Sequence, residues 1–137
     1  MAALDPETEA ALMAAALAAR ENAYAPYSNF AVGAAVLDTE GRIHAGCNVE
    51  NAAYPQGQCA EATAIGAMVL AGGREIAAVC VAGPDEVPCT PCGGCRQRIN
   101  EFAEAGTPVI VCGPSGVIAR YVIEALLPGA FGPKNLA

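Results

Sequence analysis

The chain has 137 residues, enough for a hydrophobic core of its own, and we expect residues 1–137 to form a single domain. Its net charge is −7 and its pI is about 4.5, so it lacks the excess of basic residues with which proteins usually bind a polynucleotide backbone. No apolar run reaches the roughly eighteen residues that a membrane span requires, so we expect neither a polynucleotide nor a membrane as partner.

The cysteine count and the acidic N-terminal segment indicate a reducing compartment. Seven cysteines are present, an odd number, and Asp5, Glu7 and Glu9 stand where a secretory signal would carry basic residues. We therefore expect a cytoplasmic protein whose thiols serve metal binding or packing rather than disulfide bonds.

The first half of the chain predicts a helix, a hairpin and a second helix. Asp5-Pro6-Glu7 has the residue types of a helix start, and an alanine-rich helix is expected from there to about residue 22, with inward-facing Leu12, Met13, Ala16 and Leu17. Alternating and β-branched residues predict two strands joined by a turn over residues 38–41, namely 30–37 and 42–49. A loop over 51–58 then precedes a helix from Cys59 to about residue 71.

The second half predicts three further strands and two helices. The strands are expected at 75–82, 108–112 and 117–121, and the helices at 92–104 and 122–126. This order of elements predicts an α/β fold, a three-layer α/β/α sandwich with a mixed five-stranded sheet. The two longer helices of the middle region both follow strands, so their N-termini should open at the same edge of the sheet.

The starts of those two helices carry the candidate metal-binding and catalytic residues. One is Cys59-Ala60-Glu61 and the other is Pro91-Cys92-Gly93-Gly94-Cys95. A helix N-terminus favours thiolate over thiol, and three thiolates leave a tetrahedral Zn²⁺ one open position, as in catalytic sites. We expect Cys59, Cys92 and Cys95 to bind the zinc and Glu61 to act as general acid and base beside its water. This order of ligands and glutamate is that of the zinc nucleobase deaminases.

Two other interpretations of the cysteines stay open at this point. Cys89 begins a second Pro-Cys-x-x-Cys match, which makes a fourth sulfur ligand conceivable, although Cys92 and Cys95 fit better because they open the helix. An iron–sulfur site is disfavoured because no fourth cysteine followed by proline is present in the run. For Cys47, Cys80 and Cys112 we expect packing in the core, and for His44 a surface or edge position.

Four stretches resemble the small single-domain cytidine deaminases, in that family's order. They read YSNFAVGAA at 27–35, GCNVENAAY at 46–54, CGGCRQ at 92–97 and LLPGAF at 126–131. The resemblance implies zinc-dependent hydrolytic deamination of cytidine and deoxycytidine to uridine and deoxyuridine with release of ammonia, a reaction of pyrimidine salvage. It also implies one Zn²⁺ per subunit and a homotetramer whose active sites are shared between subunits.

The resemblance further implies which residues contact the nucleoside. Asn48 and Glu50 are expected to hydrogen-bond the ribose hydroxyls, and Phe30 to pack near the pyrimidine. Phe131 is expected to reach a neighbouring subunit's active site. The complete set of expected substrate-binding residues is Phe30, Asn48, Glu50, Ala52, Tyr54, Ala60 and Phe131.

One position departs from the family pattern. Three-cysteine members typically carry arginine directly after Cys-Ala-Glu, where this chain has Ala62, and we hypothesise that Arg96 supplies the missing cation. Alternative functions are deamination of a modified nucleoside such as blasticidin S, or a non-catalytic scaffold stabilised by zinc.

Overall fold

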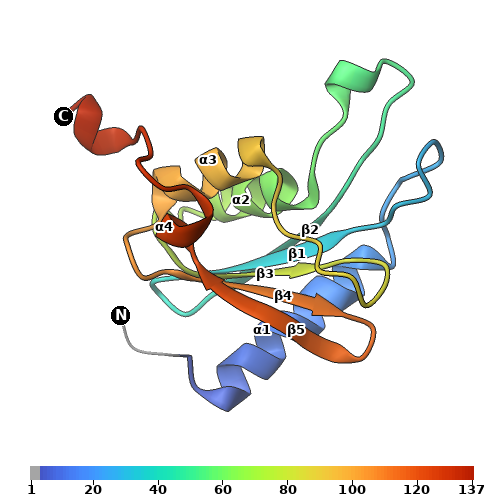
Figure 1. Cartoon of the computed structure of the whole chain (residues 1–137), viewed down its shortest axis with the longest axis horizontal. Helices are drawn as coiled ribbons and strands as arrows, with labels where there is room; N and C mark the ends of the chain where they lie inside the picture. The colour runs from blue at the N-terminus through green and yellow to red at the C-terminus, as the bar shows by residue number, and fades with distance from the viewer. Residues whose placement is uncertain (1–3) are drawn as a thin grey trace.

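One mixed five-stranded sheet organises the residues that the structure describes, 4–137, in this computed structural model (Figure 1). The helices and strands are, in chain order, α1 (Pro6–Arg20), β1 (Gly33–Asp38), β2 (Ile43–Cys47), α2 (Ala60–Leu70), β3 (Ile76–Ala82), α3 (Gly93–Phe102), β4 (Pro108–Gly113), β5 (Gly116–Val122) and α4 (Ile123–Leu126). Short 3₁₀ turns lie at Tyr54–Gln56 and Pro133–Asn135.

The sheet has the strand order β2-β1-β3-β4-β5. Antiparallel pairing joins β1 to β2, β1 to β3 and β4 to β5, whereas β3 and β4 are parallel and are connected through α3. Figure 1 shows α1 below the sheet and α2 and α3 above it. The predicted mixed five-stranded sheet with helices on both faces is therefore confirmed.

Side chains of the central strands alternate between two cores. On β3, Val79 and Val81 belong to the core beneath α2 and α3, whereas Ala78, Cys80 and Ala82 belong to the core beneath α1. This alternation is the period of two that a strand imposes on its side chains. Helices cover both faces of β3, so both sets of its side chains are buried. Residues 76–82 are therefore apolar without interruption.

The helix starts follow the residue types in the sequence. Asp5 caps α1, and its carboxylate accepts a hydrogen bond from the Thr8 backbone N–H at 2.8 Å. Of the predicted inward residues, Leu12 and Ala16 are fully buried, whereas Met13 and Leu17 are partly buried. No helix within residues 4–137 is long and apolar enough to cross a membrane.

The hairpin strands are shorter than predicted because a side chain replaces part of the ladder. Asn48 Oδ1 accepts the backbone N–H of Val32 at 2.9 Å, and Asn48 Nδ2 donates to the Phe30 carbonyl at 2.8 Å. These bonds use backbone groups that would otherwise continue the pairing of β1 with β2. As a result β1 begins at Gly33 and β2 ends at Cys47.

Two glycines let helices approach the sheet closely. A Cβ atom at Gly46 on β2 would lie 2.4 Å from the Ala64 backbone nitrogen of α2, and one at Gly33 on β1 would lie 2.0 Å from the Ala16 carbonyl of α1. No side chain fits at either position, so glycine is required for the backbones to pack against each other. Gly46 therefore fixes the depth at which α2 lies on the sheet.

A buried ion-pair cluster closes the hairpin at its turn. Asp38 is 2% exposed and accepts Arg42 Nε at 2.9 Å and His44 Nε2 at 2.8 Å. Burial alone would raise the pKa of Asp38, but the hydrogen bonds from His44, Arg42 and Glu40 and the charge of Arg42 lower it from 3.8 to about 2. His44 thus lies on an edge strand, as predicted, but its side chain is paired and largely covered.

We expect Asp38→Asn to lower the free energy of unfolding by about 2 kcal/mol at neutral pH. The folded-state pKa lies below the unfolded value, so this contribution is present above pH 3.8 and is lost as the pH falls through about 2. Urea unfolding of the parent and the variant across the acid range measures the difference, which should shrink towards low pH. Glu40→Gln is the control, because Glu40 also pairs with Arg42 but is 75% exposed. An Asp38→Asn variant that is as stable as the parent at neutral pH would contradict the assignment.

Candidate metal centre

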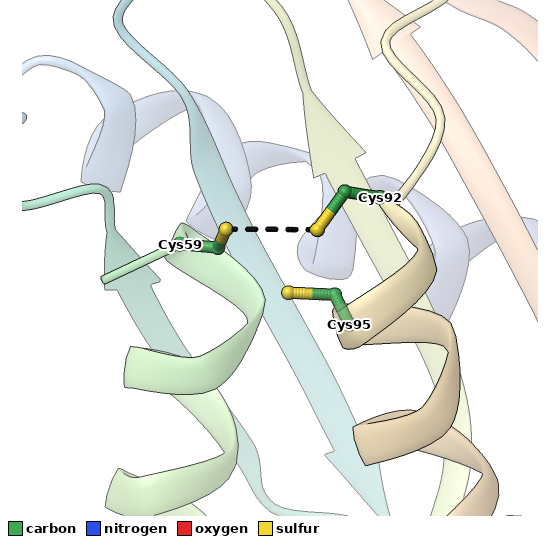
Figure 2. A group of neighbouring side chains, drawn as sticks. All are labelled: Cys59, Cys92 and Cys95. Atoms are coloured by element: carbon green, nitrogen blue, oxygen red, sulfur yellow. Dashed lines mark hydrogen bonds between the residues drawn. The ribbon is translucent and has the colours of Figure 1, made fainter. Parts of the chain in front are cut away.

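Three cysteines meet where α2 and α3 begin. Cys59 is the N-cap residue of α2, Cys92 is the N-cap residue of α3, and Cys95 lies in the first turn of α3. Figure 2 shows their side chains pointing toward one another from the two helix starts. Both helix N-termini direct their partial positive charge at this point, which favours ionised sulfur.

The sulfur positions fit a tetrahedral metal ion. The three Sγ atoms lie within 4.8 Å of one another, and the Sγ atoms of Cys59 and Cys92 are 3.8 Å apart. Thiolates bound to zinc at the usual length of about 2.3 Å lie about 3.8 Å apart in a tetrahedron. The cluster therefore needs only a small contraction to bind Zn²⁺ through three sulfurs, with one coordination position left for a non-protein ligand.

Cys89 lies outside this cluster. In the described part of the chain the group of convergent ligands contains Cys59, Cys92 and Cys95. Cys89 instead packs in the loop before α3 against the end of β3, where a Cβ atom at Gly83 would lie 2.6 Å from the Cys89 Cβ. Burial, followed by the charges of Glu61 and Asp85, raises the pKa of the Cys89 thiol to about 11. The arrangement therefore supports the Cys92 and Cys95 pair over the overlapping match that begins at Cys89.

Glu61 lies in the first turn of α2 and is 4% exposed. Burial raises the pKa of its carboxyl group, while its own backbone N–H and the charge of Arg98 act in the opposite direction. A buried carboxyl group in the first turn of a helix that also carries a metal ligand is placed as a general acid and base would be.

The hydrogen bonds of Arg96 do not reach the cluster sulfurs, so the structure gives no direct contact for the hypothesis that Arg96 compensates for Ala62. Arg96 donates from Nε to the Pro91 carbonyl at 2.7 Å, from Nη1 to the Leu126 carbonyl at 2.9 Å and from Nη2 to the Thr90 hydroxyl at 3.2 Å. The guanidinium thus joins the loop before α3 to the end of α4. The arginine that contacts a cluster sulfur is Arg98, whose Nη1 donates to Cys95 Sγ at 3.6 Å.

Asn48 and Glu50 hold the loop that precedes β1. In addition to the Asn48 bonds to Phe30 and Val32, Glu50 Oε1 accepts the backbone N–H groups of Tyr27 and Ser28, at 3.0 and 3.1 Å. The Ser28 hydroxyl donates to Glu50 Oε2. The hydrogen bond from Ser28 lowers the pKa of Glu50 and keeps it a carboxylate. Sequence reasoning missed this role, because it depends on partners more than fifteen residues away.

The other predicted substrate-binding residues lie mainly on exposed loops. Phe30 is 46%, Tyr54 76% and Phe131 58% exposed, Ala52 is also exposed, and Ala60 is fully buried in α2. The rings of Tyr27 and Tyr54 pack edge to face with centroids 6.0 Å apart. The Phe131 carbonyl accepts hydrogen bonds from Gln97 and Asn100 of α3, so the backbone of this tail segment is anchored while its ring is exposed.

The remaining cysteines lie away from the metal cluster. Cys80 and Cys112 are fully buried on β3 and β4, as predicted, with their Sγ atoms 3.6 Å apart. Cys47 differs from its prediction, because it lies at the end of the edge strand β2 and is only partly buried, facing the Asn22 carbonyl. None of the seven cysteines, all within residues 4–137, forms a disulfide bond.

Comparisons with known proteins agree with this geometry. A family model described as the cytidine and deoxycytidylate deaminase zinc-binding region matches residues 6–112, and the Cys59, Cys92 and Cys95 cluster lies within that range. The cytidine deaminase of Sporosarcina psychrophila is 45% identical over 126 residues, covering 92% of this chain and 93% of that protein. The cytidine deaminase of Halalkalibacterium halodurans is 41% identical over 125 residues, covering 91% of this chain and 95% of that protein.

Solved structures give the same result. The crystal structure of cytidine deaminase from Burkholderia pseudomallei aligns with a TM-score of 0.84 and 45% identity, covering 89% of this chain and 98% of that chain. The structure of cytidine deaminase from Mycobacterium tuberculosis aligns with a TM-score of 0.77 and 36% identity, covering 90% of this chain and 96% of that chain. The family predicted from the motifs is confirmed.

We expect Cys95→Ser to lose most of its bound zinc, because it removes a buried sulfur from the centre of the cluster. Cys89→Ser is the matched control and should keep as much zinc as the parent, because Cys89 lies outside the cluster. Zinc per chain after dialysis, measured by atomic emission, compares the three proteins. Equal zinc loss in both variants would indicate a fourth sulfur ligand and would contradict an open coordination position.

Proposed function

This chain belongs to the cytidine and deoxycytidylate deaminase family, and we propose that it hydrolyses cytidine and deoxycytidine to uridine and deoxyuridine with release of ammonia. The observation that carries the proposal is the juxtaposition of three convergent sulfurs with a buried carboxyl group, Glu61, at the starts of two helices. A site with three protein ligands keeps a position for water, whereas a purely structural zinc site has four protein ligands. This difference favours an enzyme over a scaffold.

We assign the metal to Cys59, Cys92 and Cys95. When bound there, zinc polarises a water molecule and lowers the pKa of that water towards neutrality. The two helix N-termini favour the thiolate form of the sulfurs, whereas burial raises the pKa of Cys59 and Cys95, so that binding of the metal would release their protons.

Glu61 moves the protons of the reaction. Its carboxylate accepts a proton from the water that attacks C4 of the pyrimidine and delivers it to N3. The same carboxylate then takes the proton of the hydroxyl group added at C4 and delivers it to the amine, which leaves as ammonia as the C4 carbonyl forms. Burial of Glu61 excludes bulk water, which strengthens its interactions with the reacting atoms.

Nucleoside binding is assigned to the loop residues around the site. Asn48 and Glu50 present an amide and a carboxylate, which together offer donors and acceptors to the two hydroxyls of a sugar. Their hydrogen bonds to residues 27–32 hold both side chains in place before substrate arrives. Phe30 packs near the pyrimidine, and Ala52, Tyr54 and Ala60 complete the binding residues of the subunit.

A homotetramer with shared active sites accounts for the exposed aromatic rings. Tyr54 and Phe131 are large apolar side chains that are mostly exposed in the isolated chain, and such patches commonly mark interfaces. We assign Phe131 to the active site of a neighbouring subunit. We further propose that residues 1–137 act as a single domain in the cytoplasm, in pyrimidine salvage, where a reducing environment would keep the three sulfurs of the cluster available for the metal.

We expect Glu61→Gln to lower the turnover of cytidine by roughly 10²–10⁴-fold, because a carboxamide cannot transfer the protons. Ammonia release and the absorbance change at the pyrimidine report turnover, and zinc content should stay at the parent level. Glu101→Gln, an exposed glutamate on α3, is the control and should keep parent activity. A Glu61→Gln variant with parent turnover would remove Glu61 from the mechanism. A parent protein that loads zinc but deaminates blasticidin S and not cytidine would replace the proposed substrate.

We expect Glu61→Ala and Phe131→Ala proteins to complement each other when they are unfolded together and reassembled. A mixed oligomer contains sites that combine an intact Glu61 from one subunit with an intact Phe131 from its neighbour. Activity of the reassembled mixture should therefore exceed the sum of the two variants reassembled separately. A mixture that shows only the summed activity would place both residues in the same subunit's site.

A further inference from the structure

A cationic side chain faces the metal cluster from α3. Arg98 Nη1 donates a hydrogen bond to Cys95 Sγ at 3.6 Å. The two residues are three positions apart on one helix, a spacing that places their side chains on the same face. The guanidinium therefore contacts a sulfur that the proposed function assigns to zinc.

The local sequence leaves room for this contact. Gly94 lies one turn before Arg98, and a Cβ atom at position 94 would approach Arg98 Nη1 to 3.1 Å, closer than most such contacts. Within residues 4–137 no carboxylate lies within ion-pair distance of Arg98, although its charge also acts on Glu61, where it opposes the rise that burial causes in the pKa of that carboxyl group. The neighbouring Arg96 instead donates hydrogen bonds to the backbone carbonyls of Pro91 and Leu126.

The contact places a positive charge beside a cluster of negatively charged ligands. Three thiolates and one Zn²⁺ carry a net negative charge, and Glu61 adds another close by. An excess of negative charge weakens the ability of a metal to polarise water, and α2 has no lysine or arginine to offset it. A guanidinium that hydrogen-bonds one sulfur withdraws electron density from that ligand and supplies one positive charge at the site.

We propose that Arg98 is a positioning residue of the zinc centre, which orients the Cys95 thiolate and offsets the negative charge of the three sulfurs. The proposal rests on the zinc-dependent deamination proposed above. It predicts that the charge at position 98, rather than the shape of the side chain, determines the electronic state of the cluster. Arg98 acts through Cys95 and does not itself contact the substrate.

The test compares Arg98→Gln, Arg98→Lys and the control Arg74→Gln, which removes an arginine that follows α2 and donates to the Val69 carbonyl near the C-terminus of that helix. Each protein is loaded with Co²⁺, and the position of the thiolate-to-cobalt charge-transfer band is measured. Zinc affinity is measured separately by competition with a chelator. Removing the cation raises the energy of the sulfur lone pairs, so the band of Arg98→Gln should move to longer wavelength, and its zinc affinity should fall by about 10-fold or more. Arg98→Lys should retain most of both properties, and Arg74→Gln should match the parent.

Kinetics on the zinc-loaded proteins add a second, separate readout. Arg98→Gln should lower kcat by about 10-fold with little change in KM, because Arg98 acts on the metal ligand Cys95 and is not among the residues assigned to nucleoside binding. An unchanged cobalt band and zinc affinity in Arg98→Gln would overturn the proposal, as would equal changes in Arg98→Gln and Arg98→Lys. Neither spectroscopy nor chelator competition requires cytidine turnover, so failure of the proposed function would be seen separately, as a parent protein that binds metal without deaminating.

Discussion

The meeting of two helix N-termini over one face of the sheet is the constraint on which the site depends. α2 lies directly on β2 because Gly46 has no side chain, and α3 follows β3 and returns to the parallel strand β4. These two placements bring Cys59 and Cys92, both N-cap residues, to a sulfur separation of 3.8 Å. The metal centre is thus set by how the helices pack on the sheet, and no flexible loop has to close to assemble it.

The candidate active site concentrates acidic groups in a protein that is already negatively charged, so their negative charge needs to be offset locally. The chain has a net charge of −7, yet its candidate active site gathers three sulfurs and a buried carboxyl group, all of which become less stable when more negative charge is added. Helix N-termini and Arg98 are the sources of positive charge at this point. The buried carboxylate of Asp38, at the turn of the hairpin, is likewise stabilised by nearby side chains, those of Arg42 and His44.

Local rules were sufficient to predict the elements and the cluster. Helix caps, turn residues and alternation gave the order of strands and helices, and two short cysteine motifs at helix starts gave the convergent sulfurs. Contacts between distant segments were not predictable in this way: the bonds of Asn48 and Glu50 to residues 27–32 depend on how the loops fold back. Spacing alone did not distinguish the two arginines, because Arg96 is four residues after Cys92 and Arg98 is three residues after Cys95. Their hydrogen bonds distinguish them, since Arg98 bonds a cluster sulfur and Arg96 bonds the Pro91 and Leu126 carbonyls.

The glycines beneath α1 and α2 also explain why the protein contains so much alanine. Helix and sheet backbones touch at Gly33 and Gly46, and small residues are buried around these contacts, including Ala16, Ala34, Ala35, Ala64 and Ala78. The chain accordingly has three phenylalanines and no tryptophan. At both glycines the facing atoms include main-chain atoms of the helix, so a change of side-chain rotamer cannot relieve the contact. A displacement of β2 at Gly46 would therefore move the first turns of α2, together with Cys59 at the start of that helix.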